Sequence, residues 1–346
     1  MASRRKSNQW LGGRVVSVTM SPMLRVAALA LLVLSVLLLA IDAPGATARE
    51  LWFLGEILLL TIATRSLGAG SAVSALSLGL GVVVAMMVGA GHALNAAGFD
   101  TSEGFANWGL IPVIEECLKF GPVVIVVLLL RRRAGLAPNP SDLLMLGCFA
   151  GAGFALAENA LLIQNNSGVA RDMARQYGPH LGPLYLVPGA WGAAGYVGHA
   201  AATGLACASF GLGLALRPRL GAAWPLAAAA GFVWVVIEHV LTNYYVGSGS
   251  GLALMLGNGR LTPWIFVAVV IAVVAVDWSR ARFTLAHSAT LRRRVGMARA
   301  ALVRTTPPLP SSRVAAAHLW LSQLRAVNAT GWFIRQDPRL AERKLS

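Results

Sequence analysis

Long apolar stretches follow one another along this chain and restrict it to folds that a lipid bilayer can hold. The composition is 56% hydrophobic and only 12% charged, whereas soluble domains carry about 25% charged residues. A run of about 20 apolar residues crosses the hydrocarbon core as a helix. We read eight stretches, at residues 23–41, 51–64, 72–91, 110–130, 143–163, 184–216, 222–246 and 261–276. The chain is therefore predicted to be an all-α, polytopic bundle of about eight transmembrane helices.

The loops between these stretches alternate in their content of Lys and Arg, which accumulate on the cytoplasmic side of a membrane. The basic loops are the N-terminal segment and every second loop after it, with Arg4, Arg5, Lys6, Arg14, Arg25, Arg65, Arg131, Arg132, Arg133, Arg217, Arg219, Arg280 and Arg282. The remaining loops hold only Arg49, Arg171, Arg175 and Arg260. This alternation predicts both termini in the cytoplasm. Abundant Gly, Ala and Arg are typical of a GC-rich bacterium, which indicates the inner (plasma) membrane.

The same pattern divides the chain into a basic cytoplasmic N-terminus (1–22), a transmembrane domain (23–278) and a basic cytoplasmic tail (279–346). The first apolar stretch precedes Ala46-Thr47-Ala48, so a cleaved signal peptide is an alternative for that segment. Cleavage would leave the other seven stretches in the same orientation.

Five ionisable residues interrupt the apolar stretches: Glu115, Glu116, Glu158, His199 and His239. Ionisable groups inside a membrane are costly and commonly mark functional sites. One residue of each stretch, namely Glu115, Glu158, His199 and His239, lies about 16–18 residues from the cytoplasmic end of that stretch, or about 24–27 Å at the helical rise. The ends used for this count are Arg131, Asp142, Arg217 and Ala222. We therefore expect four helices to bring the five residues together in the outer third of the membrane.

The spacing around these residues predicts which of them share a helix face. Glu115 and Lys119 are four residues apart, so the ammonium can offset a buried carboxylate, while Glu116 points about 100° away. Asn159 is likewise rotated off the face of Glu158, which favours a supporting role. The other motifs are Phe154-Ala155-Leu156-Ala157-Glu158-Asn159, the isolated Gly198-His199, and His239-Val240-Leu241-Thr242-Asn243.

Taken in order, Glu-Glu-x-x-Lys, Phe-x-x-x-Glu-Asn, an isolated His and His-x-x-x-Asn resemble the PrsW family of intramembrane proteases. That family is related to the bacterial CPBP-type and eukaryotic CAAX-prenyl endopeptidases. The resemblance covers roughly residues 105–250. It implies that Glu115 or Glu116 activates water and that His199 assists proton transfer or positioning. It also implies that His239 and Asn243 stabilise the oxyanion.

One position departs from the related proteins, because the CAAX-type motif ends in His where this chain has Glu158. The role of that His is therefore not transferred to Glu158, which stays a candidate catalytic residue. The resemblance further implies membrane-protein substrates, with anti-sigma factors as the example that the family provides.

The residues themselves indicate similar chemistry, because peptide hydrolysis needs a base for water, a donor for the leaving amine and donors for the oxyanion. Crowded carboxylates in a low dielectric need a nearby cation, which Lys119, a protonated His or a metal could provide. Three Glu and two His also suit zinc or another divalent ion, although no His-Glu-x-x-His spacing is present. Glutamate-type catalysis without a cofactor is favoured, and a metallopeptidase remains open. The candidate metal ligands are Glu115, Glu116, Glu158, His199 and His239.

Two other classes of function remain as alternatives. Carboxylates and histidines inside a bundle also mark proton- or cation-coupled transporters, but transport favours polar groups along the whole depth or helices broken near the midplane. A non-catalytic membrane scaffold would use the same residues for hydrogen bonds between helices. Clustering at one depth favours a reaction chamber.

The net charge of +15 comes largely from the tail, where thirteen Arg or Lys face only Asp337 and Glu342. Anionic cytoplasmic lipid is the predicted partner of this tail, and nucleic acid is not expected. Near-helical spacing predicts a surface-lying helix, with a loosely ordered tail as the alternative. The residues that define the spacing are Val314, Ala317, Leu321, Leu324 and Val327.

Overall fold

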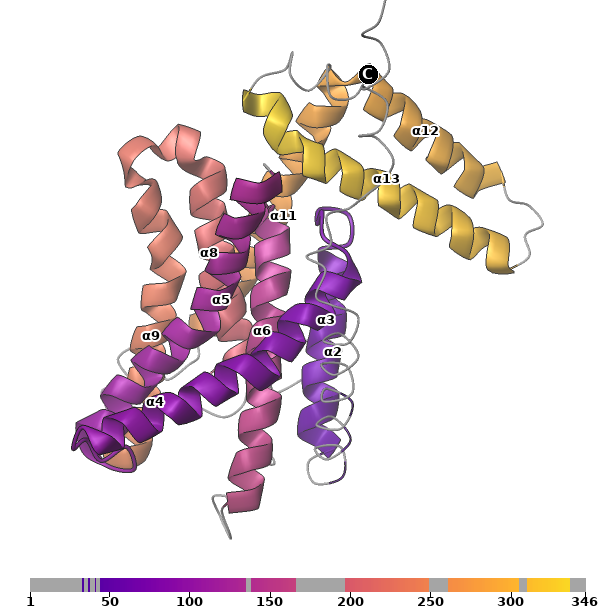
Figure 1. Ribbon diagram of the computed structural model, residues 1–346. Helices are drawn as coiled ribbons and strands as arrows, with labels where there is room; N and C mark the ends of the chain where they lie inside the picture. The colour runs from indigo at the N-terminus through magenta and orange to yellow at the C-terminus, as the bar shows by residue number, and fades with distance from the viewer. Residues whose placement is uncertain are drawn as a thin grey trace, which may run out of the picture.

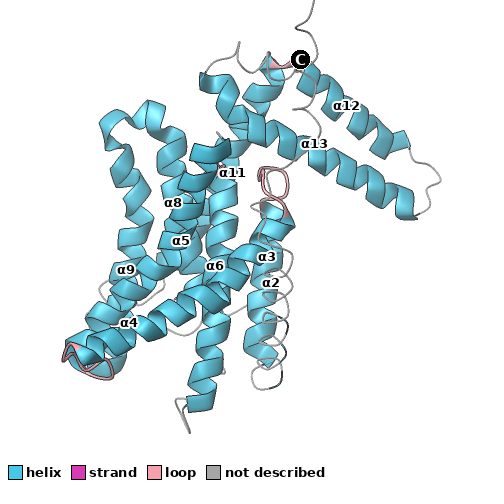
Figure 2. Cartoon of the chain, in the orientation of Figure 1, coloured by secondary structure: helices cyan, strands magenta, loops and turns pink. Residues whose placement is uncertain are grey.

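The described part of the chain is helical, and no strand occurs within it (Figure 2). The computed structural model describes residues 44–134, 138–165, 197–248, 261–304 and 310–336, together with Val33, Leu37 and Ile41. The predicted all-α class is therefore confirmed.

The helices form a bundle with a hairpin at one end (Figure 1). The bundle comprises α2 (Pro44–Leu60), α3 (Ala69–Leu78), α4 (Val84–Ala96), α5 (Ile111–Ala134), α6 (Pro140–Asn165), α8 (His199–Leu220), α9 (Trp224–Ser248) and α11 (Leu261–His287). Three short helical segments connect these helices. Segment η1 (Gly79–Val83) joins α3 to α4, η2 (Ala106–Leu110) directly precedes α5, and η4 (Gly221–Ala223) joins α8 to α9. The tail hairpin consists of α12 (Ala289–Arg304) and α13 (Pro310–Gln336) and projects sideways.

Four helical stretches in the described residues are long and apolar enough to cross a membrane, at 69–96, 140–163, 199–244 and 261–287. The third is folded back on itself at η4 and forms the α8–α9 hairpin. Helices α2 and α5 also lie where spans were predicted. The first predicted span, 23–41, lies outside the described residues apart from three positions. The count of eight crossings and the N-in, C-in topology remain predictions.

One predicted span begins later than expected. The apolar stretch 184–216 was expected to form one helix, but α8 starts at His199, directly after two residues that are not helical. Gly198 has a φ of 91°, a conformation that glycine adopts without strain and that does not continue a helix. Residues 184–196 lie outside the described residues. His199 is therefore a helix-terminal residue and does not lie mid-span.

Helix α6 is the centre of the bundle, because it is the most buried of the four candidate spans. Glycines allow its neighbours to approach closely. A Cβ on Gly151 would lie 2.2 Å from the carbonyl oxygen of His199, and a Cβ on Gly153 would lie 2.0 Å from that of Leu76. Only small residues permit this separation of the helices.

Polar contacts join several helix ends at the side of the bundle near the tail hairpin. Oδ1 of Asp142 accepts hydrogen bonds from the backbone N–H groups of Ser66 and Leu67, each at 2.8 Å. The backbone N–H of Ser141 donates to Oδ2 of Asp277 on α11 at 2.7 Å. These bonds satisfy backbone groups at the start of α6 and in the turn between α2 and α3.

The tail hairpin is attached to this same end. Nδ2 of Asn328 on α13 donates to the carbonyl oxygen of Ala63 at 2.9 Å, and Nδ2 of Asn139 donates to the Asn328 carbonyl at 3.4 Å. Val327 is buried with Ala281 and Leu291. The predicted tail helix is confirmed for residues 310–336, which excludes the loosely ordered alternative for that segment.

The apolar side chains of this helix divide into a buried group and an exposed group. Leu324 and Val327 are buried, and Val327 packs against residues of α11 and α12. By contrast, Val314 and Leu319 are 69% and 46% exposed. The second half of the predicted apolar stripe therefore packs on protein, and the exposed apolar side chains lie in the first half of α13.

Gly153→Ala should lower the thermal unfolding midpoint of the purified protein, because the new methyl group overlaps the Leu76 carbonyl oxygen. Overpacking of this kind costs about 1–3 kcal/mol. Gly89→Ala is the matched control, since nothing lies within 4 Å of its Cβ position, and it should leave the midpoint unchanged or slightly raised. Equal midpoints for the two variants would contradict the close α3–α6 contact.

Candidate functional site

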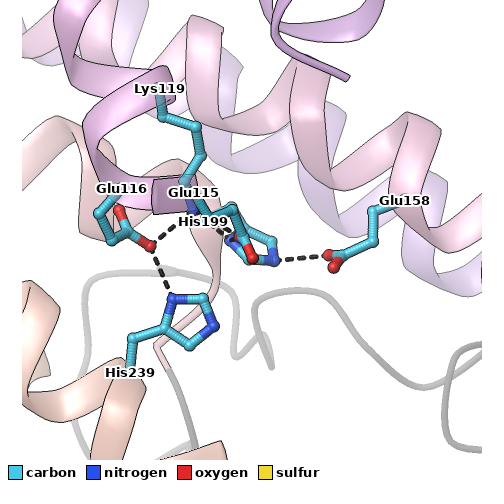
Figure 3. A network of polar contacts seen from close by, with 6 residues as sticks. All are labelled: Glu115, Glu116, Lys119, Glu158, His199 and His239. Atoms are coloured by element: carbon cyan, nitrogen blue, oxygen red, sulfur yellow. Dashed lines mark hydrogen bonds and ion pairs between the residues drawn. The ribbon is translucent and has the colours of Figure 1, made fainter. Parts of the chain in front are cut away.

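Six polar residues from four helices meet inside the bundle (Figure 3). The first turns of α5 carry three of them, and α6, α8 and α9 carry one each. Side chains on a helix lean toward its N-terminus, so Lys119 extends back over the turn that carries Glu115 and Glu116. The six residues are Glu115, Glu116, Lys119, Glu158, His199 and His239. The predicted convergence of the five ionisable residues is thus what the structure displays.

The Lys119 ammonium lies at the centre of the cluster. Its Nζ is 3.0 Å from Oε1 of Glu115 and 2.6 Å from Oε1 of Glu116. It is also 2.6 Å from Nδ1 of His199. Glu116 was expected to point away from the Glu115–Lys119 face, and that expectation is wrong for the carboxylate, because residues three apart are also neighbours on a helix.

The contacts of His199 define its tautomer. A lysine ammonium can only donate hydrogen bonds, so we infer that Nδ1 of His199 accepts and that the ring proton is on Nε2. Nε2 is 2.7 Å from Oε2 of Glu158, to which it then donates. Nδ1 also lies 3.2 Å from Oε1 of Glu115. His199 therefore connects Glu158 to the Lys119 centre.

A second branch runs from the centre to α9. Nδ1 of His239 is 2.8 Å from Oε1 of Glu116, and because a carboxylate accepts, the imidazole N–H donates. The same oxygen also accepts from Lys119. By contrast, Oε2 of Glu115 forms no hydrogen bond with any residue that the structure describes. Glu115 is therefore the less committed of the two neighbouring carboxylates.

The cluster is closed on the side of α5 and more open on the side of α6. The side chain of Lys119 is 0% exposed, whereas those of His199 and Glu158 are 12% and 33% exposed. The Phe154 ring lies 4.9 Å from Nζ of Lys119 and 5.0 Å from the His199 ring, centre to centre. Phe154 had no predicted role, although its position four residues before Glu158 places it on the same face.

Two predicted residues are not joined to the cluster. Asn243 is half-buried on α9, one turn beyond His239, and none of its contacts with described residues is a hydrogen bond to the cluster. Asn159 is buried and likewise forms no such bond. Glu238, the neighbour of His239 in the sequence, accepts a hydrogen bond from Thr262 on α11.

The site residues do not meet because they lie at equal numbers of residues from the cytoplasmic ends of their helices. A Cβ on Gly211 would lie 2.9 Å from Cα of Pro140, so Gly211 is level with the start of α6 and Arg217 lies beyond it. The chosen end of α8 was therefore not level with Asp142. Contact is achieved because Glu158 leans toward the start of α6 and His199 toward the start of α8, which brings the two side chains toward each other.

The donor types of the site fit a divalent cation. Two groups each have ligand atoms within 4.8 Å of one another, namely Glu115, Glu158 and His199, and Glu115, Glu116 and His239. Carboxylate and imidazole are ordinary zinc ligands, although each group has one His where many zinc peptidases have two. However, Lys119 already contacts members of both groups.

The fold and this cluster define a multi-pass helical membrane protein with a buried Glu/His/Lys site suited to hydrolysis. The sequence model of the PrsW family intramembrane metalloprotease matches residues 57–277, more than half of the 346-residue chain. The chain therefore belongs to the PrsW family and is an intramembrane peptidase. The match extends beyond residues 105–250, where the motifs lie, and includes most of the bundle from α2 to α11. No curated protein and no solved structure matches the chain significantly.

Removal of Glu116 should destabilise the protein more than removal of Glu158. Glu116→Ala leaves both Lys119 and His239 without their shared acceptor, and breaking a buried ion pair on one side costs about 3–5 kcal/mol. The side chain of Glu158 is 33% exposed. Water can therefore replace part of the interaction that His199 loses when Glu158 is removed. Thermal unfolding midpoints in one detergent measure the difference, with exposed Glu103→Ala as control. A larger decrease for Glu158→Ala would contradict the order of burial.

Proposed function

We propose that this protein is a glutamate-type intramembrane endopeptidase in which Glu115 is the base that activates water. The observation that carries this proposal is the difference between the two neighbouring carboxylates. Oε1 of Glu116 accepts hydrogen bonds from Lys119 and His239, while Oε2 of Glu115 has no described partner. A base must have an oxygen available for the proton that it removes.

In the proposed reaction, Glu115 removes a proton from water as the water oxygen attacks the carbonyl carbon of the peptide bond. The C–N bond then breaks, and Glu115 returns the proton to the leaving nitrogen. His199 holds Glu158 in place by donating from Nε2, and it is connected to Glu115 through Lys119, which donates to Nδ1 of His199 and to Oε1 of Glu115. His239, in its protonated form beside Glu116, donates to the oxyanion together with Asn243 from the same face of α9.

A divalent metal is the second mechanistic candidate, and the family description favours it. Either ligand group would hold the ion: Glu115, Glu158 and His199, or Glu115, Glu116 and His239. When bound, such an ion would polarise the substrate carbonyl and lower the pKa of a coordinated water.

The proposed substrates are single-pass proteins of the inner (plasma) membrane, cleaved within or beside the outer end of their membrane segment. The cluster lies in the first turns of α5 and α8, which the predicted topology places toward the outer face. Anti-sigma factors are the substrate example that the family resemblance provides. Family membership favours proteolysis over transport or scaffolding, and the gathering of six polar residues at one place supports the same choice.

Glu115→Gln should abolish cleavage, because loss of a general base costs about 10²–10⁴-fold in rate. New protein N-termini would be compared in membranes of cells that express the wild type, Glu115→Gln, the Glu115→Gln/Glu116→Gln double variant or the control Glu103→Gln at equal levels. The control keeps the wild-type termini, since Glu103 is exposed in a loop. Identical termini in all four samples, with folded proteins, would exclude proteolysis as proposed.

We also propose that the tail hairpin lies against anionic lipid on the cytoplasmic side. Arg293 and Arg299 are exposed on α12, and Val314 and Leu319 are exposed on α13. Exposed cations beside exposed apolar side chains are typical of a helix at a lipid surface.

A fluorophore at Leu319→Cys should move to a more apolar environment when the protein is in nanodiscs that contain phosphatidylglycerol rather than phosphatidylcholine alone. The labelled protein needs Cys117→Ser, because Cys117 is exposed whereas Cys148 and Cys207 are buried. The blue shift should disappear in an Arg293→Glu/Arg299→Glu variant. An equal emission maximum in both lipids would contradict an anionic partner.

A further inference from the structure

The Lys119 side chain has no contact with solvent and a complete set of acceptors. An ammonium has three N–H donors, and three acceptors surround Nζ: Oε1 of Glu115, Oε1 of Glu116 and Nδ1 of His199. The Phe154 ring covers the group from a further side, at 4.9 Å. The ammonium is thus held as a metal ion would be, by oxygen and nitrogen atoms from two helices.

The acceptors of Lys119 are also the candidate metal ligands. Glu115 belongs to both ligand groups, Glu116 to one and His199 to the other. A cation bound by either group would share Glu115 and one more acceptor with the ammonium. Two positive charges at this separation in a poorly hydrated site repel each other strongly.

We propose that Lys119 is a positioning residue whose ammonium occupies the cation position of this site, so that Lys119 and a divalent metal exclude each other. In the wild-type protein, the positive charge that the carboxylates need is part of the chain itself. The Lys119 ammonium orients both carboxylates of Glu115 and Glu116, and it sets the tautomer of His199 by donating to Nδ1. A metal enters with high affinity only when the lysine charge is removed.

The test is metal binding by the full-length protein in detergent, after removal of metal with a chelator. Zinc would be titrated against a competing fluorescent chelator, and cobalt would report coordination through its visible absorption. Lys119→Met should bind one equivalent of zinc at least about tenfold more tightly than the wild type, because a repelling charge is absent. Lys119→Arg keeps the charge and should bind zinc no better than the wild type.

A further variant locates the metal. Lys119→Met/Glu115→Gln should lose the gain in affinity, because Glu115 belongs to both ligand groups. A purely structural role of Lys119 predicts no gain in any variant. Wild-type zinc affinity equal to or tighter than that of Lys119→Met overturns the proposal, as does one equivalent of zinc retained by the wild type through dialysis.

If Lys119→Met does not fold, the wild type and Lys119→Arg still decide the question. If neither the wild type nor Lys119→Arg retains zinc, and Lys119→Arg folds where Lys119→Met does not, the site requires the internal cation that we propose. Retention of zinc by the wild type or by Lys119→Arg overturns the proposal. This proposal concerns only the cation in the site. Metal binding and the cleavage of substrates are measured separately, so either proposal can fail without the other.

Discussion

The arrangement of the site depends on one buried charge, the ammonium of Lys119. Three carboxylates in an apolar interior would repel one another and force their helices apart, because little water is present to screen them. The ammonium contacts two of them and one imidazole. His199 contacts the third carboxylate, Glu158, and His239 contacts the same Glu116 oxygen as the ammonium. Helices α5, α6, α8 and α9 are thereby joined through the ammonium, its three partners and the two residues that those partners contact.

This junction requires backbones that approach closely, and α6 provides the surface for that approach. Its glycines face α8 on one side and α3 on the other, at separations where any Cβ would overlap a carbonyl oxygen. Without a strong hydrophobic force between helices in lipid, such packing and the polar contacts within the bundle hold the helices together. The same surface that stabilises the bundle therefore brings His199 within reach of Glu158.

The sequence predicted the helical class and the residues that converge, because charged groups in apolar stretches have few places to be buried. It did not predict the details that depend on tertiary contact. The start of α8 at His199 follows from the left-handed Gly198, which hydropathy does not register. The contact of Glu116 with Lys119 depends on the reach of a flexible side chain. The register of α8 on α6 is set by glycine contacts, so the cytoplasmic ends chosen from the sequence for these two helices were not level.

The attachment of the tail hairpin also has a consequence for the order of assembly. Asn328 contacts the carbonyl oxygens of Ala63 and Arg65 and receives a bond from Asn139, so its binding surface is made of two segments that are distant in sequence. That surface exists only after α2, α3 and α6 have come together. Because α13 is synthesised after all of them, we expect its docking to be a late step of folding.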